Sequence, residues 1–570
     1  MFPKHIHGSL LLCLTIAASV AHGQHRSDIF LKNWNPTGAE KFRVDGVTSL
    51  VPPSLVDKKE IEVFEATVAE ANGKNWIVVG RIPFDYRIAI YEEYARQQGL
   101  DLEDHICRSV EGDLISHPNG NIFLCSNSPF IRAAMKQMVD ICSEAGCDWI
   151  SADLQTATHD SLKLGGCFCR HCEAGFAAFL KKPKTWSYRD FLIGRGYDTT
   201  TQIKREAWKT EASTMPFYRE YRTFQHFALR DCYNAILNEK KFLTAHDFHG
   251  HSAPLGTHTD FDSVGEAIQR SDNAKIPLLY LLTDAAGRFN YITEGPEGQW
   301  ENFAMGRLRL CQAYAYGASW VVPYEQGIKR DGRWSRISPP VEDLYTFIRE
   351  HRELFDGYES WGSVGLVYSH LGHRHRAVVS ENAVAHLVRN NVPFRLCVAG
   401  SDWWEPEFHL SGLDALVKTS DYQYLTAEQE SAVRKSGQTV VDISSLDQLW
   451  EHLDRPIQVS IGNDRINVVA RRNQRKRLLH LVNMQPGTEH RDFKVILSAR
   501  FVSPVQSANL YAPGRDPIEL SCQSAGRFVE IRVPYLKEWG IVALQVNDGS
   551  SGEPAPSEPF PAKLLQEKPE

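Results

Sequence analysis

The sequence predicts an α/β protein in which a (β/α)8 TIM barrel is followed by a smaller α/β domain and a small C-terminal antiparallel β domain. Short β-branched runs alternate with helical periodicity between about residues 43 and 327, which is typical of a parallel α/β fold. A second β-α-β series follows residue 358, and strands without helices between them begin near Asn463. A chain of 570 residues exceeds the size at which one core keeps growing, so several domains are expected.

The first 23 residues have the features of a secretory signal. Lys4 stands in a short polar opening, an apolar run covers 10–21, and the small residues Ala21 and Gly23 precede the expected cleavage point. The apolar run is too short to be a permanent membrane anchor. We therefore expect a soluble protein that is secreted or periplasmic and has no membrane partner.

Composition limits the classes of partner. The hydrophobic content of 42% and the charged content of 23% are ordinary globular values. The formal charge of -7 and the lack of a long basic run argue against nucleic acid as a ligand. Without Cys13, eleven of the 12 cysteines remain, so a complete disulfide framework is not required. Scattered cysteines are interpreted as small buried hydrophobes: Cys142, Cys147, Cys232 and Cys311.

The barrel is expected over 24–358. Its candidate strands are 44–51, 75–85, 120–126, 148–155, 241–250, 260–268, 275–284 and 317–327. Helical spacing of apolar residues over 128–146 and 217–239 supports a barrel with helices between its strands. A doubly wound open sheet is the alternative, but no Gly-rich phosphate fingerprint follows any strand.

The remaining chain is divided into three parts. An α/β domain is expected over 359–455, where Cys397 lies in a strand-like run without flanking glycines and is interpreted as a core residue. A β-sandwich domain is expected over 456–547 from the alternating runs 465–472, 477–485, 492–501 and 527–536. The tail 548–570 is rich in Pro, Ser and Glu and is expected to be disordered.

Four cysteines form a candidate metal site. Cys167, Cys169 and Cys172 are too close in sequence to pair comfortably with one another, but with Cys125 they can face one ion. Zinc is the expected metal, and four thiolates leave no position for water, so its role would be structural. A disulfide with free thiols is the alternative. His171 is expected at the surface, and no organic cofactor is expected.

The motifs "CSNSPFIR" and "GGCFCRHCEAGFAAFL" resemble glycoside hydrolase family 42, the β-galactosidases. The resemblance implies a barrel, a trimerisation domain similar to glutamine amidotransferases, a small β domain, a zinc-binding cysteine set and a homo-oligomer, by analogy a trimer. The sequence departs from the family at both catalytic glutamates. Where that family has Asn-Glu, this chain has Asp153 and Leu154, and at the seventh strand it has Thr283 and Asp284. The chain is therefore expected to be a distant relative.

Acidic residues at the expected carboxyl ends of barrel strands are the candidate catalytic groups, because the loops there form the pocket. Cleavage of a glycosidic bond needs one protonated and one ionised carboxyl group. The predicted catalytic residues are Asp153, Asp284 and Glu325. The predicted substrate-binding residues are Asp85, Gln155, His159, His246, Asp247, Glu266 and Tyr324.

Three functions remain open at this point. The first is a secreted glycoside hydrolase acting on an oligosaccharide or polysaccharide. The second is a polysaccharide lyase in which His246 or Tyr324 removes a proton beside a uronate carboxylate. The third is a carbohydrate-binding pseudoenzyme. Two further groups of residues each have two interpretations. Four histidines could bind a second metal or a sugar: His159, His246, His249 and His251. Four tryptophans could form a stacking platform for a sugar ring or belong to the core: Trp34, Trp149, Trp300 and Trp320.

Overall fold

The structure is a computed structural model. It describes residues 25–83, 87–116, 120–152, 166–197, 215–217, 220–221, 224–225, 243–247, 258–260, 277–285, 289–292, 302–330, 333–369, 378–399, 408–448, 456–474, 476–499, 501–502 and 505–546. The expected signal and tail lie outside these residues. Among the residues in these ranges, no helix has the length and apolar character needed to cross a membrane.

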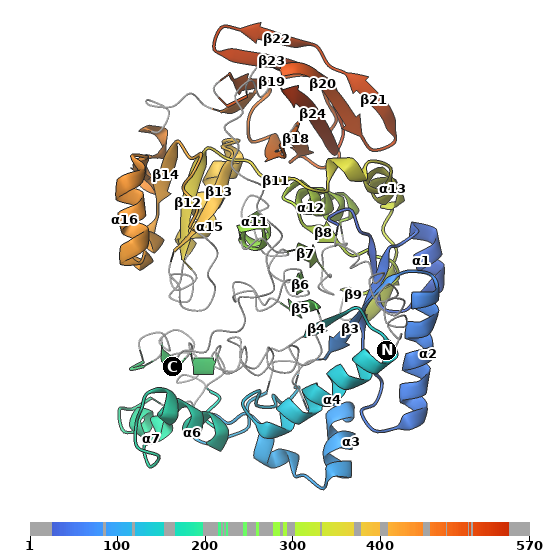
Figure 1. Ribbon diagram of the computed structural model, residues 1–570, viewed down its shortest axis with the longest axis vertical. Coiled ribbons are helices and arrows are strands. Elements are labelled where there is room, and N and C mark those ends of the chain that lie inside the picture. Colours follow the sequence, from blue (N-terminus) through green and yellow to red (C-terminus); the bar gives the residue numbers. More distant parts are fainter. Residues whose placement is uncertain are drawn as a thin grey trace, which may run out of the picture.

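Eight parallel strands form the first sheet in the order of the sequence (Figure 1). They are β1 (Phe30–Lys32), β2 (Gly46–Leu50), β3 (Ile77–Ile82), β4 (Trp149–Ala152), β5 (Leu243–Asp247), β6 (His258–Asp260), β7 (Phe289–Ile292) and β8 (Ser319–Trp320). A parallel bridge joins Leu31 to Val322, and the Val322 backbone N–H donates to the Phe30 carbonyl at 2.8 Å. The last strand thus returns to the first, and the sheet closes into the expected barrel.

Helices connect these strands. They are α1 (Pro36–Phe42), α2 (Lys58–Gly73), α3 (Ala89–Gln98), η1 (Leu102–His105), α4 (Pro129–Ala145), α6 (Arg170–Phe179), α7 (Tyr188–Ile193), α11 (Pro277–Ala285) and α12 (Phe303–Ala315). The hairpin β9 (Gln326–Arg330) and β10 (Arg333–Ile337), then α13 (Glu342–Glu350) and η3 (Arg352–Leu354), follow β8.

The helix expected over 128–146 is confirmed as α4, and its ends follow from the sequence. The Ser128 hydroxyl accepts a hydrogen bond from the Ile131 backbone N–H, and Pro129 takes the first helical position, where its missing N–H costs nothing. Gly146, at φ +88°, ends the helix in the left-handed conformation that glycine adopts without a steric penalty.

The predicted strands at 120–126 and 275–284 are wrong. Residues 120–126 belong to the connection between η1 and α4 and make only isolated bridges, such as Ile106 with Leu124. Residues 277–285 form helix α11, which begins at Pro277. Strands β1 and β7 were not predicted, and β6 begins two residues before its expected segment, most of which lies outside the described residues.

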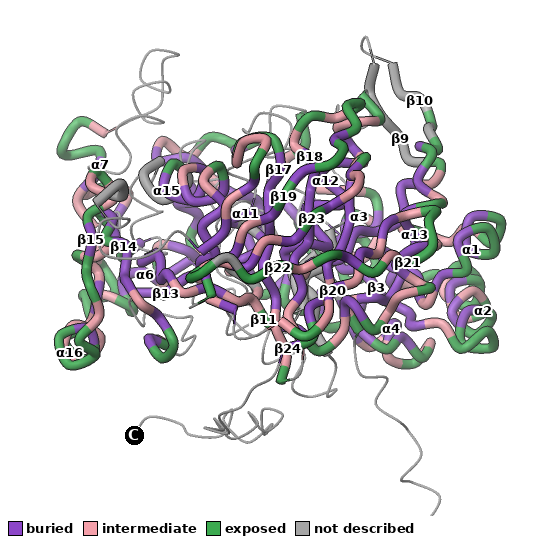
Figure 2. Tube along the Cα trace, turned by 90° about the horizontal axis from the view of Figure 1, so that it is seen from above, coloured by how far each residue is buried: buried purple, intermediate pink, exposed green. Residues whose placement is uncertain are grey.

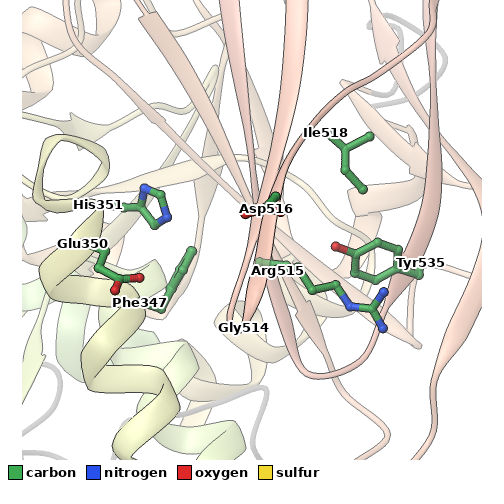
Figure 3. Close-up of a pocket in the computed structure, with 9 residues that line it drawn as sticks. Phe347, Glu350, His351, Gly514, Arg515, Asp516, Ile518 and Tyr535 are labelled. Atoms are coloured by element: carbon green, nitrogen blue, oxygen red, sulfur yellow. The ribbon is translucent and has the colours of Figure 1, made fainter.

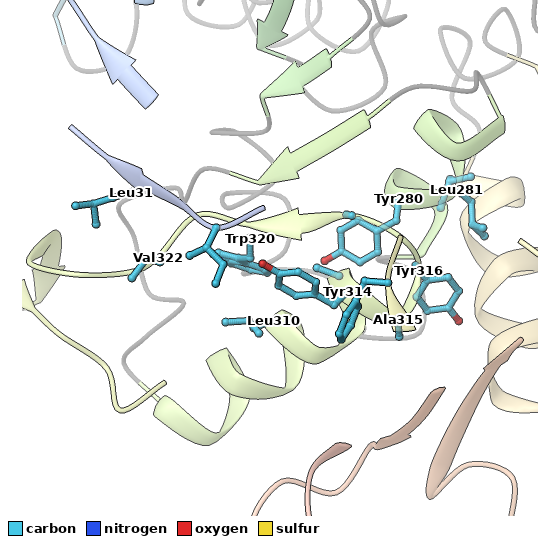
Figure 4. Close-up of a cluster of buried hydrophobic side chains, with 14 of the residues drawn as sticks. Leu31, Tyr280, Leu281, Leu310, Tyr314, Ala315, Tyr316, Trp320 and Val322 are labelled. Carbon is cyan, nitrogen blue, oxygen red and sulfur yellow. The ribbon is translucent and has the colours of Figure 1, made fainter. Parts of the chain in front are cut away.

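Among the described side chains, an apolar cluster lies in the barrel interior, and it consists of Phe30, Ile77, Val79, Trp149 and Val321. Phe30 and Trp149 have ring centroids 5.7 Å apart. Since neighbouring strand residues point to opposite faces, the residues between these point outward to the helices. Figure 4 shows such outward side chains, Leu31, Trp320 and Val322, together with Leu310 and Tyr314 of α12.

A second parallel sheet has the order β13-β12-β14-β15. Its elements are β12 (Val364–Ser369), α15 (Val378–Arg389), β13 (Phe394–Ala399), β14 (Ala415–Lys418), η4 (Ser420–Tyr424), α16 (Ala427–Ser436), β15 (Thr439–Asp442) and η5 (Ile443–Gln448). Helix α11 of the barrel contacts β13. Cys397 is buried in β13, as expected for a core residue, and burial raises the pKa of its thiol to about 12.

Two antiparallel sheets complete the fold, in the orders β11-β17-β18-β24-β20-β21 and β16-β19-β23-β22. Their strands are β11 (Glu359–Ser360), β16 (Ile457–Val459), β17 (Ile466–Arg472), β18 (Lys476–Asn483), β19 (His490–Ser498), β20 (Val505–Ala512), β21 (Arg515–Glu519), β22 (Cys522–Ala525), β23 (Phe528–Leu536) and β24 (Trp539–Val546). Strand β11 pairs with β17 although a whole parallel sheet separates them in sequence. The expected division at residues 358 and 455 stays a prediction.

The barrel and the antiparallel sheets share polar contacts and apolar packing. Arg307 of α12 donates from Nε to Glu538 at 2.9 Å and from Nη1 to Asp343 at 2.8 Å. Figure 2 shows buried residues through the centre of the molecule and exposed residues on the outer helices α1, α2 and α16. The two parts therefore pack as one body along this joint.

His480 of β18 lies in this joint against Trp539 and Phe355, and neither of its ring nitrogens has a hydrogen-bond partner in the described part of the chain. Burial lowers its pKa to about 3, whereas the unfolded chain binds the proton at the ordinary value of 6.5. Stability should therefore fall as pH drops from 6.5 toward 3, by up to about 1.4 kcal/mol per pH unit from this residue.

We expect H480F to remove this part of the pH dependence. Chemical unfolding measured at pH 7 and at pH 5 should show a free energy of unfolding that falls by about 2 kcal/mol less in the variant than in the parent. An identical pH dependence in both proteins would contradict the assignment.

Candidate active site at the mouth of the barrel

Among the side chains that the structure describes, two cations point inward at the carboxyl ends of the barrel strands. Phe30 and Val79 point inward, so the next residues of the same parity, Lys32 on β1 and Arg81 on β3, point inward one layer closer to the mouth. Arg81 is buried and donates from Nη1 to the Ser49 hydroxyl at 3.1 Å. A buried guanidinium needs acceptors around it, so this layer is a polar floor above the apolar core.

Glu325 lies on the rim of the mouth, just after β8. Its Oε2 accepts a hydrogen bond from Asn35 Nδ2 at 3.1 Å and lies 3.7 Å from Arg336 Nη1 of β10. Its backbone N–H donates to the Ser338 hydroxyl at 3.2 Å. Asn35 also accepts from the Gly38 N–H at the start of α1, so its amide is fixed by the helix cap. The segments that follow β1 and β8 thus hold this carboxylate, and its side chain is 44% exposed.

Three residues at the ends of barrel strands have left-handed backbones: Asn33 (φ +61°), Ser49 (φ +62°) and Glu325 (φ +50°). This conformation is costly for a residue with a Cβ and persists where the surrounding structure enforces it. Such strain collects at functional sites, and here it lies after β1, at β2 and after β8, which are neighbours in the closed barrel.

Tyr324, predicted to bind substrate, packs outward instead. Its ring lies against Gly38, where an added Cβ would come within 2.4 Å of it, and edge-on to Phe42 with centroids 5.9 Å apart. The physical reason is strand parity: Val321 points into the barrel, so Tyr324 points to the helix layer. Its ring belongs to the packing between the end of β8 and α1.

The structure also corrects the placement of Asp284. This residue is at the C-terminal end of α11, which leads into the amino end of β7, so it lies at the face of the barrel opposite the mouth. Its Oδ1 accepts from Arg26 Nη2 at 2.7 Å and from Arg471 Nη2 at 3.2 Å. Both arginines also donate to the Tyr358 carbonyl. Asp284 therefore joins the barrel to β17 and does not reach a substrate at the mouth.

Several predicted residues lie outside the described residues: Asp85, Asp153, Gln155, His159 and Glu266. His246 and Asp247 are the last residues of β5, and only their backbone is described. Asp247 is in register with Asp260 of β6, so both backbones reach the mouth at neighbouring positions. Of the four tryptophans considered, Trp149 and Trp320 are core residues, Trp34 packs partly buried on Trp76, and Trp300 lies outside the described residues.

The four predicted metal ligands converge. One Sγ from each of Cys125, Cys167, Cys169 and Cys172 lies within 4.8 Å of the others, and all four residues are buried. A tetrahedral zinc ion with Zn–S bonds of about 2.3 Å has its sulfurs about 3.8 Å apart, so the set fits such an ion. Asn127, from the Asn-Ser-Pro turn before α4, donates to the Cys172 sulfur at 3.3 Å.

A fifth buried thiol, Cys107, adjoins the cluster. Hydrogen bonding with Cys107 raises the pKa of Cys125, and hydrogen bonding with Cys125 raises that of Cys172. Burial opposes ionisation of Cys167, but hydrogen bonds from the surrounding thiols outweigh it and hold the pKa of Cys167 well below its ordinary value.

Sequence reasoning missed Lys32, Asn35, Ser49 and Arg81. The signal for Arg81 was present, because it is a single charge in the otherwise apolar run 76–84. A charge in a strand that is buried on both faces must have a polar environment, which in a barrel is found at its mouth.

Comparisons with known proteins support the fold. No family model matches the chain. Among the solved structures that share its fold is alpha-L-fucosidase isoenzyme 2 from Paenibacillus thiaminolyticus, with a TM-score of 0.61 and 12% identity; the match covers 92% of this chain and 100% of that one. Another is a GH42 β-galactosidase from G. stearothermophilus, with a TM-score of 0.56 and 10% identity; the match covers 92% of this chain and 99% of that one. At these identities the likeness is one of fold, and it extends to the family that the cysteine motif resembles.

A more specific similarity is found in sequence. The chain is 24% identical over 549 residues to an alpha-agarase of Thalassotalea agarivorans, and the match covers 83% of this chain. It covers 36% of that protein, so the chain spans about a third of the length of this relative.

Proposed function

We propose that the chain is a glycoside hydrolase that cleaves an agar-type algal polysaccharide at the mouth of its barrel. The observation that carries the proposal is the similarity to an alpha-agarase over 83% of the chain. The mouth supports it, because a carboxylate on the rim, Glu325, stands above a floor with two cations, Lys32 and Arg81. Export by the expected signal, to the periplasm or the medium, is part of the same proposal, as is assembly into a homo-oligomer.

Glu325 and Asp153 are the proposed catalytic pair, and Asp284 is withdrawn. Asp153 follows the last residue of β4 in sequence and has the same parity as Trp149, which points into the barrel, whereas Leu154 has the opposite parity. One carboxyl group would protonate the departing oxygen while the other, ionised, attacks the sugar carbon or activates water.

We also propose that the four-cysteine cluster binds one zinc ion. Its role would be structural, because four thiolates fill a tetrahedral shell and leave no open position for water or substrate. The ion would tie the segment before α4 to the start of α6, two connections that flank β4.

The test is turnover of agarose by the purified full chain, followed as new reducing ends and shorter chains. E325Q and D153N should each lower turnover at least about a hundredfold, because each removes a proton-transfer or nucleophilic group. E342Q is the matched control: Glu342 has the same exposed fraction as Glu325, 44%, but pairs with Lys41 outside the mouth, so turnover should not change.

Full activity in both catalytic variants would refute the assignment. The products also separate the other functions. Unsaturated products that absorb in the near ultraviolet would indicate a lyase, and binding of agarose without shortening would indicate a pseudoenzyme.

A further inference from the structure

A cavity of about 500 Å³ lies far from the mouth, between α13 of the barrel and the antiparallel sheets. Figure 3 shows Phe347, Glu350 and His351 on the helix side and Arg515 and Tyr535 on the strand side. Its volume falls in the range of about 300–1,000 Å³ that is usual for small-molecule sites, and such sites occur preferentially at domain interfaces.

The cavity is at the other end of the barrel from Glu325. His351 ends α13, and the following residue, Arg352, donates from Nη2 to Asp45 Oδ1 at 2.7 Å. Asp45 immediately precedes β2, so this end of α13 lies beside the amino ends of the strands. A ligand in the cavity would not compete for the mouth.

The lining offers hydrogen-bond donors and acceptors, and it carries both positive and negative charge. The Arg515 guanidinium lies 4.0 Å from the centroid of the Tyr535 ring, which fixes its plane in the cavity wall. The Tyr535 hydroxyl oxygen is shielded from solvent, so this residue contributes its ring to the lining. Glu350 and Asp516 add acceptors. The Phe347 ring adds an apolar surface.

This mixture fits one class of ligand best. Charges of both signs do not favour a strongly charged ligand of either sign. A neutral sugar ring has hydroxyl groups that both donate and accept, and C–H faces that pack on apolar surface.

We propose that this cavity is a second carbohydrate-binding site, which holds a neutral sugar unit of a polysaccharide chain while another part of the same substrate, or a neighbouring chain, is at the mouth. The choice of agarose as that polysaccharide rests on the proposed function. A second contact on the same protein raises the effective concentration of substrate at the mouth without any change there.

The test measures binding separately from cleavage. The full chain carrying E325Q and D153N is run in native gels with and without agarose, and its dissociation constant is obtained from the retardation. On this background R515A should weaken binding about tenfold, because it removes a charged donor and the stacked plane, and D516N about threefold, because it removes a charged acceptor from the lining. R532A is the matched control, since Arg532 is on the same strand as Tyr535 but pairs with Asp492 in solvent.

Each outcome decides a separate point. If R515A and D516N both bind agarose like the parent and unfold at the parent's temperature, the proposal is overturned. It is also overturned if the parent shows no retardation. D516N keeps the test valid if R515A does not fold, because Asp516 is exposed and the change replaces one carboxylate oxygen by an amide nitrogen. If the unsubstituted chain fails to cleave agarose but is retarded in a way that depends on Arg515, the proposed activity fails and the second site stands.

Discussion

C172S is expected to lose the proposed zinc ion and to be less stable by at least about 3 kcal/mol, because the free energy of metal binding contributes directly to folding where the ligands are assembled by the fold. The sulfur of Cys172 lies 3.5 Å from that of Cys125 and accepts a hydrogen bond from Asn127. Metal content by mass spectrometry and thermal unfolding with and without a chelator would measure both effects.

C311S is the matched control for this experiment. Cys311 is as fully buried as Cys172 but lies in α12, away from the cluster, so the substitution should lower stability without lowering the zinc content. The zinc proposal would be refuted by a parent protein without bound metal, or by peptide mapping that finds two of the four cysteines joined in a disulfide.

D284N is expected to destabilise the protein by about 3–5 kcal/mol while the folded fraction keeps its turnover. The substitution leaves two guanidinium groups, of Arg26 and the almost fully buried Arg471, without their shared carboxylate, and an uncompensated buried charge is among the costliest defects in a fold. Denaturant unfolding measures the first effect, and activity per folded molecule at low temperature measures the second.

D492N is the matched control for D284N. Asp492 pairs with Arg532 where both side chains are 67% exposed, so the same chemical change should cost less than about 1 kcal/mol. A stable D284N protein with lost turnover would restore the catalytic role first predicted for Asp284.

The sequence predicted the fold class because half of the barrel strands have a clear local signal in the sequence. Strands β2, β3, β4 and β8 lie inside β-branched runs that end at turn residues. The apolar run of α11 has no periodicity because the helix is covered on opposite sides, and a run of that kind has the same pattern in a buried strand. Strands β1 and β7 span only Phe30–Lys32 and Phe289–Ile292, so their neighbours in the sheet define them.

The candidate site was predictable where chemistry is encoded by residue spacing. The cysteine cluster follows from such spacing, and the structure brings its four sulfurs together. The error at Asp284 came directly from the wrong element type, since a carboxylate after a strand would have faced the mouth and one after a helix faces the other end. Arg81 is visible in the sequence as a lone charge in an apolar run, but its direction depends on which face of β3 points inward.

The pairing of β11 with β17, together with the contact of Arg471 with Asp284, limits how this chain can be cut. A fragment ending near residue 455 keeps all eight barrel strands but leaves β11 without its hydrogen-bonding neighbour and exposes α11 where Arg471 had covered it. A hybrid protein that contains this barrel would therefore also have to contain the C-terminal antiparallel sheets. The two parts would have to be transferred together.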